Sequence, residues 1–93
     1  MKAVVDGQIV AQSSEVIDCK GYQYFSPASV RTDWLEKTEK TTEDLECPHG
    51  VQFYDVVVAG KRHPRAAWSY ESPQPEMKAV KDRFGFWQDV EVV

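Results

Sequence analysis

The sequence predicts a mainly β domain of short antiparallel strands with two short helices. Three observations favour this class. Residues 51–59 form a run rich in β-branched and aromatic side chains, which is typical of a strand. Other short apolar stretches alternate with polar residues and are separated by glycine or proline turns. Strand and helix patterns do not alternate along the chain, so we expect no parallel doubly wound sheet.

The first 25 residues predict short strands joined by tight turns. Residues 3–5 and 8–11 flank Asp6-Gly7, a dipeptide that tolerates the positive φ angles of a two-residue hairpin. Residues 16–19 and 22–25 then lie on either side of Gly21, where we expect the chain to turn again.

Residues 27–36 predict the first helix. Ser26 suits the N-cap, and Pro27 suits the first helical position because its fixed φ matches a helix. Val30 and Trp34 are four residues apart and would lie on one face of that helix.

The polar stretch 37–46 predicts a solvated loop, and loops of this length often border a functional site. Residues 46–50 read ECPHG and predict a turn. Pro48 fixes φ and removes a backbone donor, and Gly50 permits a sharp bend before the next strand.

The second half of the chain predicts two further strands separated by a turn at Gly60. Residues 51–59 form the first, and residues 66–70 the second. In the second, Trp68 and Tyr70 are two residues apart, so we expect both side chains on one face of the sheet.

The last part of the chain predicts the second helix and a final strand. Pro75 can begin a helix in which Met77, Val80 and Phe84 share one face. Residues 86–93 alternate well enough to form the final strand.

Length and charge limit the number of domains and the classes of partner. The chain has 93 residues, a net charge of −4 and a pI of about 5.1, so we expect one domain over residues 1–93 that repels phosphate backbones. The basic run at 61–65 is expected to be a solvated turn, and we predict no nucleic-acid partner. No export signal or membrane span is found, which predicts a soluble cytoplasmic protein whose two cysteines stay reduced.

The chain contains four potential zinc ligands, but their spacing is poor. Structural zinc sites use pairs of cysteines on one tight turn, and here only Cys47 and His49 are close in sequence, while Cys19 and His63 are isolated. We therefore predict no metal and no other cofactor, with these four residues as the alternative. Without zinc, we expect Cys19 to be a small buried side chain in a strand and both histidines to be surface turn residues.

Cys47 is the candidate nucleophile. A reactive thiol needs a nearby cation or a helix N-terminus to lower its pKa, and His49 could help only if its ring folds back. Glu46 and the acidic residues before it act against the thiolate.

The aromatic residues are numerous for a chain of this length, and core packing accounts for some of them. Tyrosines on alternating strand positions could also line a pocket for a small anionic or planar ligand, with an arginine from the first helix. The candidate ligand-binding residues are Tyr24, Phe25, Arg31, Cys47, Tyr54, Trp68 and Tyr70.

Several motifs together resemble one family. They are YQYFSPASVR at 22–31, CPHG at 47–50, FYDVVV at 53–58, AAWSYESPQP at 66–75 and FGFWQDVEV at 84–92. In this order they resemble the family of domains of unknown function numbered 427, also labelled as nucleotidyltransferase-like. The resemblance covers essentially the whole chain.

The resemblance implies a fold more than an activity. It implies a small β-tent, similar to the thalidomide-binding domain of cereblon and to methionine-R-sulfoxide reductase. Relatives of that fold hold zinc with two Cys-x-x-Cys pairs, which this chain lacks. The family's Cys-Pro-aromatic-Lys-Gly run is one residue shorter here, with His49 at the aromatic position and no lysine. The carboxylate pattern gives the transferase label no support.

Three functional hypotheses follow. The first is a module that binds a small molecule or a partner in an aromatic pocket. The second is an enzyme that uses Cys47 in redox or transfer chemistry. The third is a structural module that forms a homodimer through its edge strands.

Overall fold

The computed structural model describes residues 1–93, which form nine strands, one α-helix and three 3₁₀-helices. The strands are β1 (Lys2–Val5), β2 (Gln8–Gln12), β3 (Ile17–Cys19), β4 (Tyr22–Tyr24), β5 (Leu35–Lys37), β6 (Val51–Val58), β7 (Lys61–Tyr70), β8 (Phe84–Phe86) and β9 (Glu91–Val92). The helices are η1 (Pro27–Ser29), η2 (Thr32–Trp34), α1 (Thr42–Glu46) and η3 (Pro75–Val80). The predicted mainly β class is confirmed, because strands dominate the regular structure.

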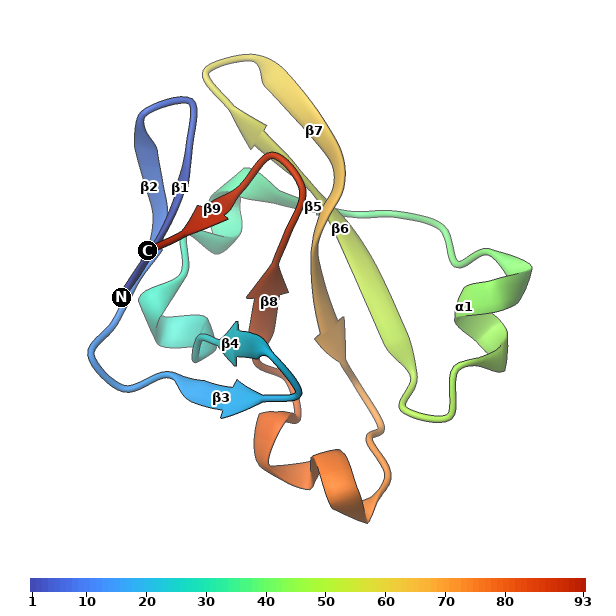
Figure 1. The fold of residues 1–93 in the computed structure, drawn as a ribbon. Helices are drawn as coiled ribbons and strands as arrows, with labels where there is room; N and C mark the ends of the chain where they lie inside the picture. The colour runs from blue at the N-terminus through green and yellow to red at the C-terminus, as the bar shows by residue number, and fades with distance from the viewer.

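The strands form three antiparallel sheets (Figure 1). The largest has the order β5-β6-β7-β8, and its long central hairpin β6–β7 crosses the middle of the molecule. A second sheet has the order β2-β1-β9, and the third is the hairpin β3–β4. Because β1 pairs with β9, the two ends of the chain lie together, and the Lys2 N–H donates to the Val93 carbonyl at 2.7 Å.

Both predicted turns in the first 25 residues are present. Asp6 and Gly7 have φ angles of 51° and 76° at the tip of the β1–β2 hairpin. Lys20 and Gly21 have φ angles of 52° and 89° at the tip of β3–β4. Positive φ at both central residues gives a turn whose twist matches that of the flanking strands, which is why the short dipeptides form hairpins here.

Strand β7 begins earlier than the sequence predicts. It starts at Lys61 rather than at residue 66, and a bulge around Pro64 and Arg65 divides it. Arg65 has a φ of 52°, and its N–H donates to the Asp55 side chain at 2.9 Å across the irregular register. A proline is tolerated at a bulge because no ladder hydrogen bond is required there.

The prediction of a single helix over 27–36 is wrong. The segment forms two 3₁₀ turns, η1 and η2, and then enters strand β5. Val30 lies between the turns with extended backbone and forms an isolated bridge with Ala11. Sheet contacts that bury Val30 therefore prevail over the helical spacing of Val30 and Trp34, since a helix this short is marginal by itself.

The stretch 37–46 is not only a loop, because it contains α1. Thr41 caps this helix: its side chain accepts from the Asp44 N–H, and the Asp44 side chain accepts from the Thr41 N–H. This reciprocal pattern is a capping box, which is visible in the sequence as Thr-x-x-Asp.

The second predicted helix is shorter than expected. Pro75 does begin a helix, but η3 ends at Val80 and is of the 3₁₀ type. Phe84 belongs to β8 instead, and the predicted final strand over 86–93 is divided between β8 and β9. None of the helices is long and apolar enough to cross a membrane.

Two apolar clusters lie on opposite faces of the β6–β7–β8 sheet, since alternate residues of a strand point to opposite sides. The cluster called here the closed core consists of Ala3, Val5, Val10, Ala11, Phe25, Val30, Val56, Val58, Ala66, Ala67, Phe84, Phe86 and Val90. The second cluster is smaller and consists of Tyr24, Val51, Trp68, Met77 and Val80, with partly buried neighbours from β3, β6 and β7. The β3–β4 hairpin and η3 cover only part of this second face.

Candidate functional site

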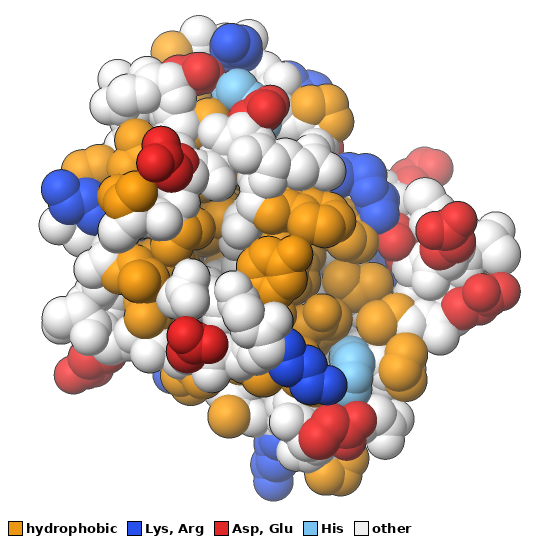
Figure 2. Space-filling model, in the orientation of Figure 1, with side chains coloured by type: hydrophobic (Ala, Val, Ile, Leu, Met, Phe, Trp, Pro, Cys, Tyr) orange, Lys and Arg blue, Asp and Glu red, His pale blue; other side chains and the backbone are white.

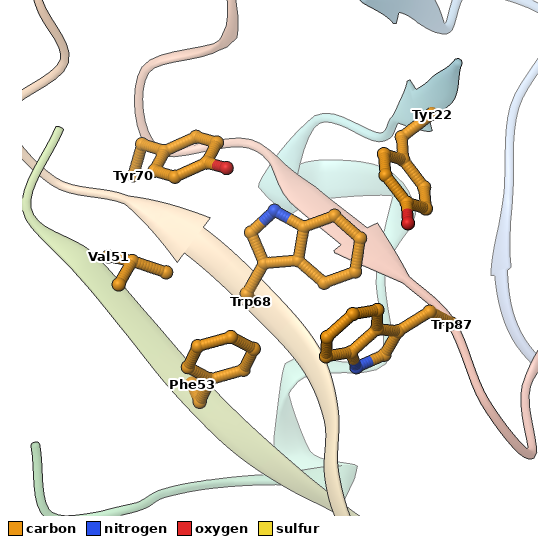
Figure 3. A pocket seen from close by; sticks show the side chains of 6 residues that line it. All are labelled: Tyr22, Val51, Phe53, Trp68, Tyr70 and Trp87. Atoms are coloured by element: carbon orange, nitrogen blue, oxygen red, sulfur yellow. The ribbon is translucent and has the colours of Figure 1, made fainter. Parts of the chain in front are cut away.

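The uncovered part of the second face forms an open recess of about 120 Å³. It is lined by six hydrophobic residues, of which five are aromatic, and it is called here the aromatic recess. Its residues are Tyr22, Val51, Phe53, Trp68, Tyr70 and Trp87 (Figure 3). Figure 2 shows hydrophobic side chains gathered near the middle of the same molecular face that Figure 1 presents.

The register of β6 and β7 places four of these side chains. Phe53 lies directly opposite Trp68, and Val51 lies directly opposite Tyr70, so the four side chains share one face. Tyr22 reaches the recess from β4, across the gap between sheets, as Figure 3 shows. The predicted common face of Trp68 and Tyr70 is therefore present.

Gly85 determines how the Trp68 indole lies. It is the cross-strand partner of Trp68 on β8, and a Cβ at that position would be 2.6 Å from Cζ2 and 2.8 Å from Cε2 of the indole. The missing side chain lets the indole lie against the β8 backbone. Figure 3 places Trp68 in the middle of the lining residues, where it forms the floor of the recess.

The rings of the recess stand at steep angles to one another. Tyr22 and Trp68 have centroids 4.9 Å apart and planes at 87°, and Trp68 and Trp87 have centroids 5.3 Å apart and planes at 65°. Phe53 is stacked on Trp87 at 5.9 Å and 23°. These edge-to-face and offset contacts are favourable ring geometries, so the recess walls are held in place by one another.

Few polar groups are available inside the recess. The Trp87 Nε1–H donates to the Arg65 carbonyl at 2.7 Å. The Trp68 Nε1 is buried and has no hydrogen-bond partner. Burial raises the pKa of the Tyr70 hydroxyl above its usual value, so this group stays neutral at physiological pH. The recess therefore offers mainly ring surface and carries no charge of its own.

A charged pair lies beside the recess at Phe53. The Arg65 guanidinium is 4.0 Å from the Phe53 ring centroid and forms two hydrogen bonds of 3.1 and 2.8 Å with Asp44. Asp44 is buried, and the Arg65 hydrogen bonds lower its pKa to about 2. The pair thus holds α1 against the β7 bulge and neutralises the cation beside Phe53.

The structure brings together some of the residues predicted to bind a ligand. Trp68 and Tyr70 line the recess. Tyr24 packs behind them, with its ring perpendicular to Trp68 at 6.0 Å, and it is buried. Cys47 is partly buried against the same cluster. The roles of these four residues in binding stay predictions.

Three other predicted residues lie elsewhere. Phe25 is part of the closed core and contacts Phe86. Tyr54 is on the opposite face of β6 from the recess and packs against the closed core. The Arg31 side chain is 56% exposed and pairs with Asp33 at 3.3 Å, so it is not placed to hold an anion in the recess.

Four lining residues are absent from the predicted set: Tyr22, Val51, Phe53 and Trp87. The strand periodicity could have identified Phe53 and Val51, because they alternate on β6 as Trp68 and Tyr70 do on β7. No local pattern indicates Tyr22 or Trp87, which reach the recess from distant segments.

The four potential zinc ligands do not converge. The structure contains no group of three or more His, Cys, Asp or Glu side chains placed to hold a metal ion. Cys19 contacts the Met77 sulfur at 3.5 Å, and His49 accepts a hydrogen bond from the Gln74 N–H.

The expectation that His63 is a surface turn residue is wrong. Its side chain is buried, with Nδ1 2.9 Å from Asp89 and Nε2 2.7 Å from Asp6. The two carboxylates raise the pKa of the imidazole, with the Asp89 hydrogen bond as the largest cause. His63 therefore links β7 to the β1–β2 turn and to the segment before β9.

Cys47 stands at the C-cap of α1, and its N–H donates to the Asp44 carbonyl. Cys47 thus lies at the C-terminal end of α1 and not at a helix N-terminus, where reactive cysteines are often found. The His49 Nδ1 accepts from Gln74, so that nitrogen is not free to take a proton from the thiol. These contacts give no support to a primed nucleophile, and the enzyme hypothesis stays a prediction.

A family model described as Domain of unknown function (DUF427) matches residues 1–93, which is the whole chain. No curated protein matches the chain.

Proposed function

The chain belongs to the DUF427 family, and from this premise we propose that it is a binding module whose aromatic recess holds a small ligand or one side chain of a partner. One observation carries the proposal: five aromatic side chains surround an open recess, while the core residues on the opposite face of the same sheet are at most 8% exposed. Concave sites lined by aromatic residues are the usual places where proteins hold small molecules.

The free energy that is lost when these rings stay exposed to water supports the same proposal. Burying a large apolar side chain stabilises a protein by about 1.5–3 kcal/mol, so a short chain gains by covering its rings. Here the Tyr22 side chain stays 40% exposed next to Trp68 and the recess remains open. A ligand that fills the recess would supply the missing cover.

Nuclear magnetic resonance titration with small aromatic fragments tests the proposal. We expect fragments to shift the indole N–H signals of Trp68 and Trp87. Trp34 is a half-buried tryptophan outside the recess and serves as an internal control whose signal should stay in place.

A pair of variants makes this test specific. Tyr22→Ala removes a recess wall and should weaken fragment binding, whereas Ile9→Ala removes an equally exposed side chain elsewhere and should not. Fragments that shift Trp34 as strongly as the recess tryptophans would refute the proposal. So would a failure of these fragments and of the cationic probes described below to shift any of the three indole signals.

A further inference from the structure

We infer that the group held in the recess is a methylated ammonium cation. This inference rests on the proposed binding function and names the chemical class of its ligand. A cation is attracted to the faces of aromatic rings, most strongly to tryptophan, and quaternary ammonium groups are recognised in this way.

The angles between the rings favour a rounded cation over a flat ligand. Tyr22 stands at 87° to Trp68, and Trp87 stands at 65° to it. The one nearly parallel pair, Phe53 and Trp87, is stacked ring on ring at 5.9 Å and leaves no slot for a further ring between them. A flat ring needs two nearly parallel surfaces to be held by stacking on both sides. Walls that meet at steep angles suit a compact group that is attracted to ring surfaces from several directions.

The polar groups of the recess are few. The Trp87 Nε1–H is already donated to the Arg65 carbonyl, and the Trp68 Nε1 is buried without a partner. The Tyr22 and Tyr70 hydroxyls are the other side-chain polar groups of the lining. A fully methylated ammonium has no N–H donor, so its binding depends on the ring surfaces and not on these groups.

The charge around the recess fits a cation. None of the six lining residues is charged, and Arg65, which lies over Phe53, is neutralised by its two hydrogen bonds to Asp44. The Arg65 guanidinium over Phe53 and the Arg31 guanidinium over Trp34, at 4.0 and 4.4 Å, show that the rings of this chain already accept cations. The net charge of −4 favours the approach of positive ligands.

The test compares choline with its neutral carbon isostere, in which a tert-butyl group replaces trimethylammonium. Both are titrated into the intact chain and followed by the Trp68 and Trp87 indole signals. The two probes have nearly the same shape, so the difference in affinity reports charge. We expect choline to bind at least about tenfold more tightly, as a desolvated cation–π contact predicts.

Variants at Tyr22 separate ring character from apolar bulk. Tyr22→Phe keeps a ring and should preserve the preference for choline, whereas Tyr22→Leu keeps apolar bulk and should reduce it. Tyr22 is partly exposed, so both variants are expected to fold. An unchanged preference in Tyr22→Leu would overturn the inference.

A second arm identifies the source of the cation. A short peptide with trimethyl-lysine is compared with the same peptide carrying unmodified lysine, and with free choline. Tighter binding of the methylated peptide than of choline indicates a protein partner, and equal binding indicates a small molecule. Both results support the methylated ammonium class.

The outcomes distinguish this inference from the proposed function. Equal binding of choline and its isostere, or binding of aromatic fragments alone, would overturn the cation but leave the recess as a binding site. Failure of every probe, fragments included, would overturn both.

Discussion

The two faces of the β6–β7–β8 sheet have similar apolar character but different cover. One face carries the closed core, whose residues are at most 8% exposed and include members of the β1–β2 hairpin and the segment around Val30. The other carries the second cluster, over which β3–β4 and η3 leave the aromatic recess open. The closed core contains mainly small aliphatic residues with three phenylalanines, whereas the recess is lined almost entirely by tyrosine, tryptophan and phenylalanine.

We propose that this difference separates a face used for packing from a face used for binding. Aliphatic residues and phenylalanine fill a closed space without polar atoms to satisfy, so they suit the covered face. Tyrosine and tryptophan combine a large ring with a polar edge, so they tolerate a face that is partly open to water. The following substitutions test whether the two faces do have these separate roles.

The largest effect is expected from Phe25→Ala in the closed core. Phe25 is fully buried and packs on Phe86, so the substitution leaves a cavity and should lower the free energy of unfolding by about 3–5 kcal/mol. Urea unfolding followed by far-ultraviolet circular dichroism measures this loss. A loss below about 1 kcal/mol would mean that this face is not the one that holds the fold.

A smaller effect on stability is expected from Gly85→Ala. Gly85 lies on β8 opposite Trp68, between two phenylalanines of the closed core. The added methyl would lie 2.6 Å from the Trp68 ring, so the indole must move away from β8. Overpacking of this kind should cost about 1–3 kcal/mol in stability. It should also change the near-ultraviolet circular dichroism of the tryptophans. Unchanged tryptophan signals would contradict the role of Gly85 in placing the recess floor.

The free energy of unfolding should also depend on pH, because His63 links β7 to the β1–β2 turn and to the segment before β9. The folded pKa of His63 is raised by Asp89 and Asp6. Its stabilising effect is therefore complete below the unfolded pKa of about 6.5 and is lost as the pH rises through the folded pKa.

Unfolding experiments at a series of pH values from 6 upwards, each at about 0.1 M salt, measure this loss. Asp89→Asn weakens the contact and should flatten the dependence. A stability that rises over the same range in the unmodified chain would refute the assignment of a charged His63 between the two carboxylates.

The smallest effect on stability is expected from Tyr22→Ala in the recess. Its ring is partly exposed, so its loss should lower the free energy of unfolding by less than about 1 kcal/mol. Ligand binding should fall strongly in the same variant, which is the reverse of the behaviour expected for Phe25→Ala. Thermal unfolding and the fragment titration measure the two quantities. A large loss of stability here would assign the recess to packing alone.

Much of the local structure could be predicted because it depends on neighbouring residues. Asp6-Gly7 forms a hairpin turn since both residues tolerate positive φ, and the run at Val51–Val58 forms a strand through its β-branched side chains. Helix type was less predictable. Val30 has helical spacing to Trp34, but its bridge to Ala11 draws the backbone into an extended form. The contact that decides this outcome lies 19 residues away (30 − 11), beyond any local pattern.

The candidate site was also predictable only in part. Alternation along β7 by itself determined that Trp68 and Tyr70 share a face, because side chains of a strand point to opposite sides in turn. Only the tertiary structure decided that Tyr22 and Trp87 join them, that Arg31 and Tyr54 do not, and that His63 is buried between two aspartates. These outcomes depend on which segments cover which face, and that choice is made by contacts between residues far apart in the chain.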